Sequence, residues 1–131
     1  MSPDLKYLLL SAILCFVQML IAATGATQQV GRPALAGNRE GLPEIVGWAG
    51  RARRAHLNMV ENLVLFSALV LIAAVAGKAN AMTAMGAMIF FWARLAYAVI
   101  YLIGIPWVRT LVWFVSVIGM AMIAWVLLQA M

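Results

Sequence analysis

The sequence predicts an all-α membrane protein, a single domain over residues 1–131 that folds as an antiparallel bundle of four transmembrane helices. Apolar residues make up 66% of the chain, only 10% are charged, and the mean hydropathy is +1.02. A soluble domain is about 45–50% apolar and about 25% charged, and a chain this short cannot bury so much apolar surface in a water-soluble core. The apolar residues also fall into four runs, each close to the roughly 20 residues that cross a bilayer.

The composition excludes several other classes of protein. A soluble enzyme, a disordered segment and a nucleic-acid-binding arm all need more polar sequence than this chain has. The lone cysteine, Cys15, excludes an intrachain disulfide and a metal site built from several cysteines. The net charge of +5 is explained by membrane topology, as the positions of the arginines show.

Four helical spans are expected, at residues 5–26, 51–76, 79–105 and 108–131. The length of the first favours a retained span over a cleaved signal peptide. The long connection at residues 27–50 contains several glycines and two prolines and reads as an exposed loop. Only the Gly77–Lys78 region separates the second and third spans, and Pro106 ends the third because proline cannot continue a helix.

The basic residues divide unequally between the two ends of the predicted bundle. Lys6 and Lys78 lie at one end, and six arginines lie at the other: Arg32, Arg39, Arg51, Arg53, Arg54 and Arg109. The positive-inside rule then places the long connection in the cytoplasm and both termini outside.

A polar stripe opens the second span. Arg51, Arg54, Asn58 and Glu61 are spaced three, four and three residues apart, so a helix presents them on one side. At 1.5 Å per residue, Glu61 lies about 9 Å below the start of the apolar sequence. A carboxylate at that depth is costly unless it meets a partner or a water-filled cavity, so it indicates a functional site.

A second stripe follows in the third span, where Arg94, Tyr97 and Tyr101 are spaced three and four residues apart. Arg94 lies about 16 Å below the end of its span. Arg109 lies at the start of the fourth span, at the same end of the bundle. The two stripes converge on one leaflet, where arginines outnumber the single carboxylate. Such a surplus of positive charge favours an anionic ligand that arginine can bind bidentately.

Each of these features also has a purely structural interpretation. Arginines such as Arg53 commonly fix topology by reaching the lipid headgroups. Arg94 and Glu61 would form a structural ion pair between neighbouring helices. The remaining polar side chains would be interfacial, interhelical hydrogen-bonding or simply small and apolar: His56, Ser11, Gln18, Ser67 and Cys15.

Three segments resemble the membrane-associated proteins in eicosanoid and glutathione metabolism, the MAPEG family. Residues 54–62, Arg-Ala-His-Leu-Asn-Met-Val-Glu-Asn, are similar to the family's Arg-Ala-x-x-Asn-x-x-Glu signature, closest to the microsomal glutathione transferases. Residues 94–101 resemble its third-helix Arg-x-x-(His or Tyr)-x-x-x-Tyr, and residues 106–110 resemble the arginine that opens its fourth helix. The match covers about residues 51–116 in order and spacing.

The resemblance implies a homotrimer in which glutathione, the co-substrate, binds between adjacent protomers and faces the cytoplasm. The implied glutathione contacts on the second helix are Arg51, Arg54, His56, Asn58 and Glu61. Those on the third helix of the neighbour are Arg94, Tyr97 and Tyr101. Arg109 corresponds to the catalytic arginine that stabilises the thiolate, and no metal is implied. The short prokaryotic relatives imply a bacterial inner membrane.

The implied function is a membrane-bound glutathione transferase or peroxidase that acts on lipophilic electrophiles arriving from the bilayer. One alternative is a non-catalytic membrane scaffold that binds lipid or glutathione, and a remote one is a small multidrug-type transporter. Three features depart from the family pattern: Arg109 follows Tyr101 by one residue fewer than in the microsomal transferases, Tyr97 is the choice of leukotriene C4 synthase, and Arg32 and Arg39 have no counterpart.

Overall fold

The computed structural model describes all 131 residues and is entirely helical. A short helix and four long ones follow in the order α1 (Pro3–Val30), α2 (Arg32–Ala36), α3 (Gly47–Val75), α4 (Ala81–Ile103) and α5 (Pro106–Gln129). The four long helices are each long and apolar enough to cross a bilayer. The predicted four-span helical architecture of an integral membrane protein is therefore confirmed.

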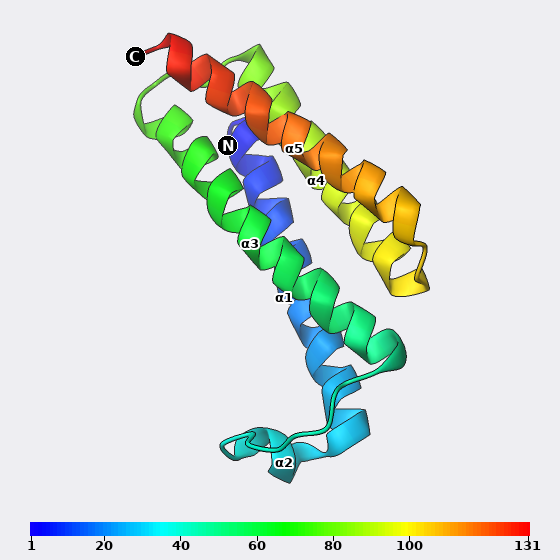
Figure 1. Cartoon of the computed structure of the whole chain (residues 1–131). Coiled ribbons are helices and arrows are strands. Elements are labelled where there is room, and N and C mark those ends of the chain that lie inside the picture. The colour runs from blue at the N-terminus through cyan, green and yellow to red at the C-terminus, as the bar shows by residue number, and fades with distance from the viewer.

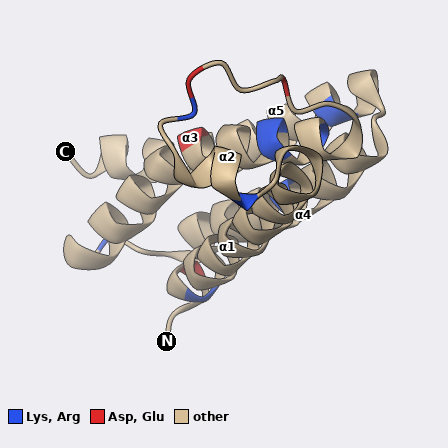
Figure 2. Cartoon of the chain, turned by 90° about the horizontal axis from the view of Figure 1, so that it is seen from below, with Lys and Arg blue, Asp and Glu red and all other residues tan.

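Helix α4 occupies the middle of the bundle. It packs against α1, α3 and α5, whereas α1 and α5 do not pack against each other. Both termini and the α3–α4 turn lie toward one end, and α2 with its connection lies at the other (Figure 1). Helices α1 and α3 extend beyond the α4–α5 turn at the α2 end (Figure 1). In the view from below, most of the Lys and Arg positions, coloured blue on the ribbon, lie around α2 and the near ends of the long helices (Figure 2).

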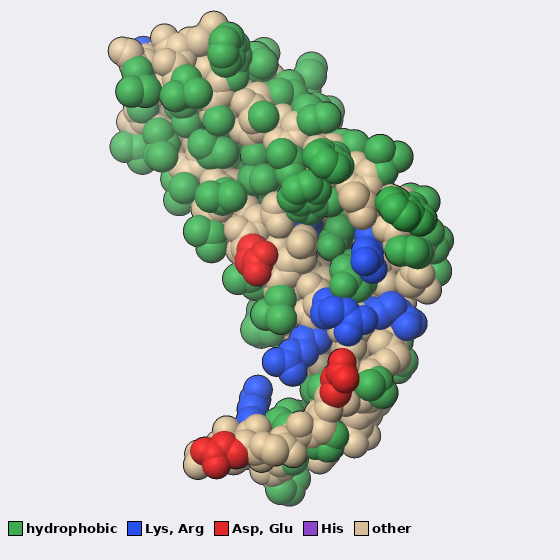
Figure 3. Space-filling model, viewed as in Figure 1, with side chains coloured by type: hydrophobic (Ala, Val, Ile, Leu, Met, Phe, Trp, Pro, Cys, Tyr) green, Lys and Arg blue, Asp and Glu red, His purple; other side chains and the backbone are tan.

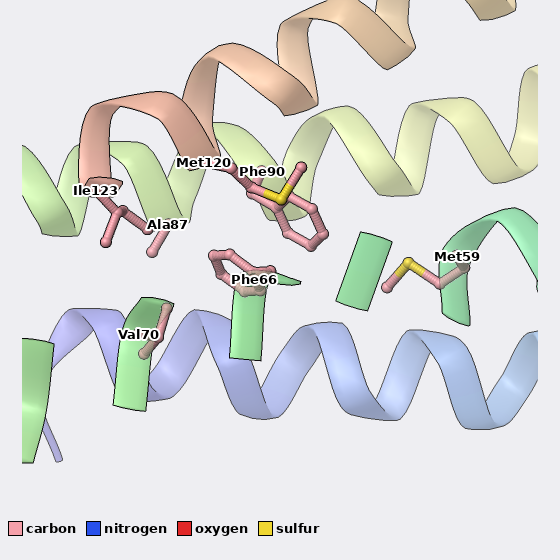
Figure 4. Close-up of a cluster of buried hydrophobic side chains, with 7 residues drawn as sticks. All are labelled: Met59, Phe66, Val70, Ala87, Phe90, Met120 and Ile123. Carbon is pink, nitrogen blue, oxygen red and sulfur yellow. The ribbon is translucent and has the colours of Figure 1, made fainter. Parts of the chain in front are cut away.

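The core lies where α3, α4 and α5 meet (Figure 4). Its seven buried residues are Met59, Phe66, Val70, Ala87, Phe90, Met120 and Ile123. The rings of Phe66 and Phe90 stack with their centroids 3.9 Å apart. Many large apolar side chains are exposed, and on the face shown in Figure 3 they gather over the upper part of the bundle, in keeping with a lipid environment.

Two glycines bring α4 and α5 into backbone contact. A Cβ added at Gly86 would stand 2.5 Å from the carbonyl oxygen of Gly119, and one added at Gly119 would stand 2.6 Å from that of Gly86. Small residues commonly allow such close approach in membranes, where van der Waals packing is a main force between helices.

The helix ends differ from the sequence-based bounds, most of all at the long connection. Helix α1 continues to Val30 and stops at Gly31, whose φ of +82° breaks the helix. Helix α3 begins at Gly47, so the expected loop at residues 27–50 is shorter and contains α2. The sequence-based bounds followed the apolar residues. Backbone hydrogen bonding, however, continues α1 through the polar residues Thr27, Gln28 and Gln29, and the helix ends where Gly31 interrupts it.

The later ends also move by a few residues. The side chain of Asn80 caps α4, which therefore begins at Ala81, and α4 ends at Gly104 in the left-handed conformation. Pro106 occupies the first turn of α5, where its missing N–H costs nothing, so this span begins two residues earlier than expected.

Candidate functional site

The two predicted stripes come together within one chain, between the first half of α3 and the second half of α4. The Nη2 of Arg94 donates to the Oδ1 of Asn58 at 2.9 Å. One turn toward the α2 end, the Nε of Arg54 donates to the Tyr101 hydroxyl at 3.2 Å. Arg51 closes the series by donating from Nε to the carbonyl oxygen of Leu102 at 3.0 Å. The resemblance implies that glutathione binds between the second-helix stripe of one protomer and the third-helix stripe of its neighbour; within one chain the two stripes also contact each other directly.

Arg94 is the most deeply placed cation of the site. Its side chain is only 1% exposed, and its guanidinium carbon lies 4.2 Å from the centroid of the Tyr97 ring. Its Nε and Nη1 have no hydrogen-bond partner. Because buried donors are costly to leave unpaired, and a buried charge more so, this guanidinium favours an acceptor such as an anion or ordered water.

Tyr101 lies between two arginines. Arg54 bonds to its hydroxyl, and the guanidinium carbon of the half-buried Arg109 lies 4.5 Å from its ring centroid. This cation–π contact joins the start of α5 to the end of α4. Arg109 therefore lies against the stripe of the third span, beside the bond between Arg54 and Tyr101.

Asn62 belongs to this network although the sequence analysis gave it no role. Its Nδ2 donates to the carbonyl oxygen of Asn58 at 2.8 Å and to the Oδ1 of Asn58 at 3.2 Å. The second bond holds the Asn58 amide with its oxygen toward Arg94. The spacing of four residues between the two asparagines was the available signal, since such residues are neighbours on a helix.

Glu61 is separate from this cluster. It is exposed, and the flanking Val60 and Val64 are exposed with it. At 100° per residue the α3 stripe is about 80° wide, so Asn58 faces α4 while Arg54 and Glu61 lie at the outer edge. Arg94 bonds to Asn58, so the structure does not form the Arg94–Glu61 ion pair that was the structural alternative.

His56 faces α1 rather than α4. Its Nδ1 lies 3.9 Å from the Sγ of Cys15, and both side chains are half-buried. Two neighbours of Cys15 on α1 were expected to make interhelical hydrogen bonds, but the buried Ser11 Oγ and Gln18 Oε1 have no partner. The polar interior of the bundle thus has more hydrogen-bonding capacity than the chain itself satisfies.

Comparison with known proteins gives one family. Residues 5–129 match the MAPEG family, a range that includes all nine predicted site residues. No curated protein and no solved structure matches significantly.

Proposed function

This chain belongs to the MAPEG family, and we propose that it is a membrane-bound transferase that joins glutathione to lipophilic electrophiles. The observation that carries this proposal is the surplus of arginines along successive turns of α3 and α4. Arg51, Arg54 and Arg94 bond to a carbonyl, a hydroxyl and an amide, and none of these partners carries a negative charge. Glutathione offers two carboxylates to such a site, and its ammonium group suits Glu61.

The chemistry requires a thiolate. A thiol with an ordinary pKa of about 8.5 is only about 3% ionised at pH 7, and neighbouring cations lower such values to about 3.5–7.5. Arg109 would supply the positive charge. The sulfur then attacks the electrophilic carbon, for example of an aryl halide, and the halide leaves with its electron pair. With a lipid hydroperoxide, two glutathione molecules would instead yield the alcohol, water and glutathione disulfide.

The proposed assembly is a homotrimer. In one chain Glu61 is exposed among apolar side chains, although a carboxylate inside the bilayer costs about 2.5–3.5 kcal/mol on insertion scales. A second copy that covers this face would remove that cost and bring Glu61 to the shared ligand. The number three comes from the family resemblance.

The proposed location is the bacterial inner membrane, with the α1–α3 connection in the cytoplasm and both termini outside. Glutathione sets the thiol redox poise of the cytosol, so a site at this end would meet its co-substrate directly. The six arginines at this end against two lysines at the other support this orientation.

The test is calorimetry of the detergent-purified chain with glutathione and with S-hexylglutathione. Glu61→Gln and Arg54→Ala should each weaken binding by about 2–5 kcal/mol, the range for removing one partner of a buried charge pair. Arg53→Ala is the matched control, because Arg53 is exposed and makes no hydrogen bond to the site. Equal affinity in all four proteins would overturn the site assignment. If the protein binds glutathione but does not conjugate it to an activated aryl halide, the non-catalytic scaffold becomes the better interpretation.

A further inference from the structure

A groove of about 890 Å³ opens on one side of the chain, between the second half of α1, residues 35–45 and the first turns of α3. Figure 3 shows the hollowed face, with Lys and Arg side chains gathered along its lower part. The apolar wall includes Met19 and Leu57, and the polar wall includes Arg39, Arg53 and Arg54. Arg39 and Arg53 belong to none of the predicted glutathione contacts.

The walls of the groove are held in place by specific contacts. The Gln29 side chain bonds to both backbone groups of Val46, with its Nε2 donating at 2.6 Å and its Oε1 accepting at 3.0 Å. This pair ties the end of α1 to the start of α3. The buried Ile45 lies against Gly50 so closely that a Cβ there would overlap the Ile45 carbonyl oxygen. The segment at residues 35–45, which lines one side of the groove, is therefore held against α1 and α3 by these contacts.

The arginines of the groove have free donors. Arg39 bonds from its Nε to the carbonyl oxygen of Leu35 at 2.8 Å, and Arg54 bonds from its Nε to Tyr101. Their terminal nitrogens and the whole guanidinium of Arg53 remain available. Glu44 is the only carboxylate in the lining. Three guanidinium groups against one carboxylate suit an anion, and the planar fork of arginine matches phosphate oxygens well.

Polarity changes along the length of the groove. Met19 lies eleven residues before the end of α1, which is about 16 Å at 1.5 Å per residue. Its end of the groove thus reaches the depth of the hydrocarbon, while Arg39 lies in the connection outside the spans. A phospholipid has an acyl chain and a phosphate in this same order. Glutathione and inorganic phosphate have no apolar part that would cover Met19 and Leu57.

We propose that the groove binds one anionic phospholipid, with its phosphate between Arg39 and Arg53 and an acyl chain along Met19 and Leu57. The site is adjacent to the proposed glutathione site, with which it shares Arg54 and His56. It does not depend on any catalytic activity.

The test is a titration of the full chain, purified in neutral detergent, with dioctanoylphosphatidylglycerol, followed by native mass spectrometry. We expect one lipid per chain. Arg39→Gln and Arg53→Gln should each weaken binding about fivefold, since one basic residue contributes about 1 kcal/mol to attraction for anionic lipid. Leu57→Asn should also weaken it. Arg32→Gln is the matched control, because Arg32 is exposed in the same connection but does not line the groove.

Three results would overturn the proposal. The first is equal affinity of wild type, Arg39→Gln and Arg53→Gln for the lipid. The second is binding of inorganic phosphate as tight as that of the lipid, which would make this a free phosphate site. The third is a loss of glutathione affinity in Arg53→Gln as large as the loss of lipid affinity, which would mean that the groove binds glutathione. Weakened lipid binding by Arg39→Gln and Arg53→Gln, with unchanged glutathione binding, supports the proposal.

Discussion

Single residues decide which atoms of the site are available to a ligand. Asn58 shows this well, because its amide oxygen accepts from both Arg94 and Asn62 and is thereby directed toward α4. Arg94 is left with two unpaired donors in the interior. The arginines of the site are thus held through part of each guanidinium while the remaining nitrogens stay free. Such partly bonded cations are preorganised for an anion, since little side-chain entropy remains to be lost on binding.

Arg109 carries the most specific prediction at this scale. Arg109→Leu should leave glutathione binding largely intact but raise the pKa of the bound thiol, because a permanent positive charge near the sulfur is removed. Thiolate absorbance near 240 nm would then appear only at higher pH, and conjugation of an activated aryl halide would slow about 10²–10³-fold.

The comparison with Arg94→Leu identifies which arginine acts on the sulfur. If Arg109→Leu titrates like the wild type and Arg94→Leu does not, the thiolate role belongs to Arg94. If Arg109→Leu loses only expression or stability, Arg109 merely fixes the start of α5 against Tyr101, a contact that the structure already contains.

At the scale of helices, α4 and α5 are joined where Gly86 and Gly119 meet. No side chain lies between the two backbones at this point, so the helices cannot accommodate an added methyl group without moving apart. The contact lies beside Phe90 and Ile123 of the core, and separation there would loosen their packing.

Gly119→Ala should therefore destabilise the protein by about 1–3 kcal/mol, the usual range for overpacking. Its Cβ would stand 2.6 Å from the Gly86 carbonyl oxygen and 2.9 Å from the backbone nitrogen of Phe90, and neither is the end of a flexible side chain. Thermal unfolding in detergent measures the loss. Gly37→Ala serves as control, since its nearest neighbour is 3.6 Å away. A wild-type melting temperature for Gly119→Ala would contradict the close contact.

The outer surface of the whole molecule carries one acidic residue in apolar surroundings. Glu61 stands exposed on α3 between apolar neighbours. The trimer proposal predicts three chains by native mass spectrometry in mild detergent. Val64→Phe, one turn from Glu61, should weaken that assembly, whereas Val75→Phe, at a position 88% exposed at the end of α3, should not. A monomer that still binds glutathione would refute the shared site.

Orientation in the membrane is tested at the same scale. In a Cys15→Ala background, a cysteine at the exposed Asn38 of the connection should resist a membrane-impermeant maleimide in intact cells. The reason is the excess of arginines at that end of the bundle. A cysteine at Ser2, exposed at the opposite end, should react readily. Labelling in the reverse order would invert the proposed topology.

The sequence by itself determined the class of protein, its four spans and the two stripes of polar residues. It could do so because bilayer thickness sets the length of an apolar helix and helical geometry sets which residues share a side. It placed helix ends less well, since Gly31 and Asn80 stop or start helices by backbone geometry and capping rather than by polarity.

Only the tertiary structure decided which side chains meet. The sequence placed Asn58 and Glu61 on one stripe. In the structure α4 packs against only one edge of that stripe, so Asn58 contacts Arg94 while Glu61 stays exposed. The groove was equally beyond sequence pattern, because Met19, Arg39 and Arg53 come from three segments that no helical period relates. The physical reason is the same in both cases. Periodicity orders residues within one helix, whereas a site between helices depends on how their surfaces pack.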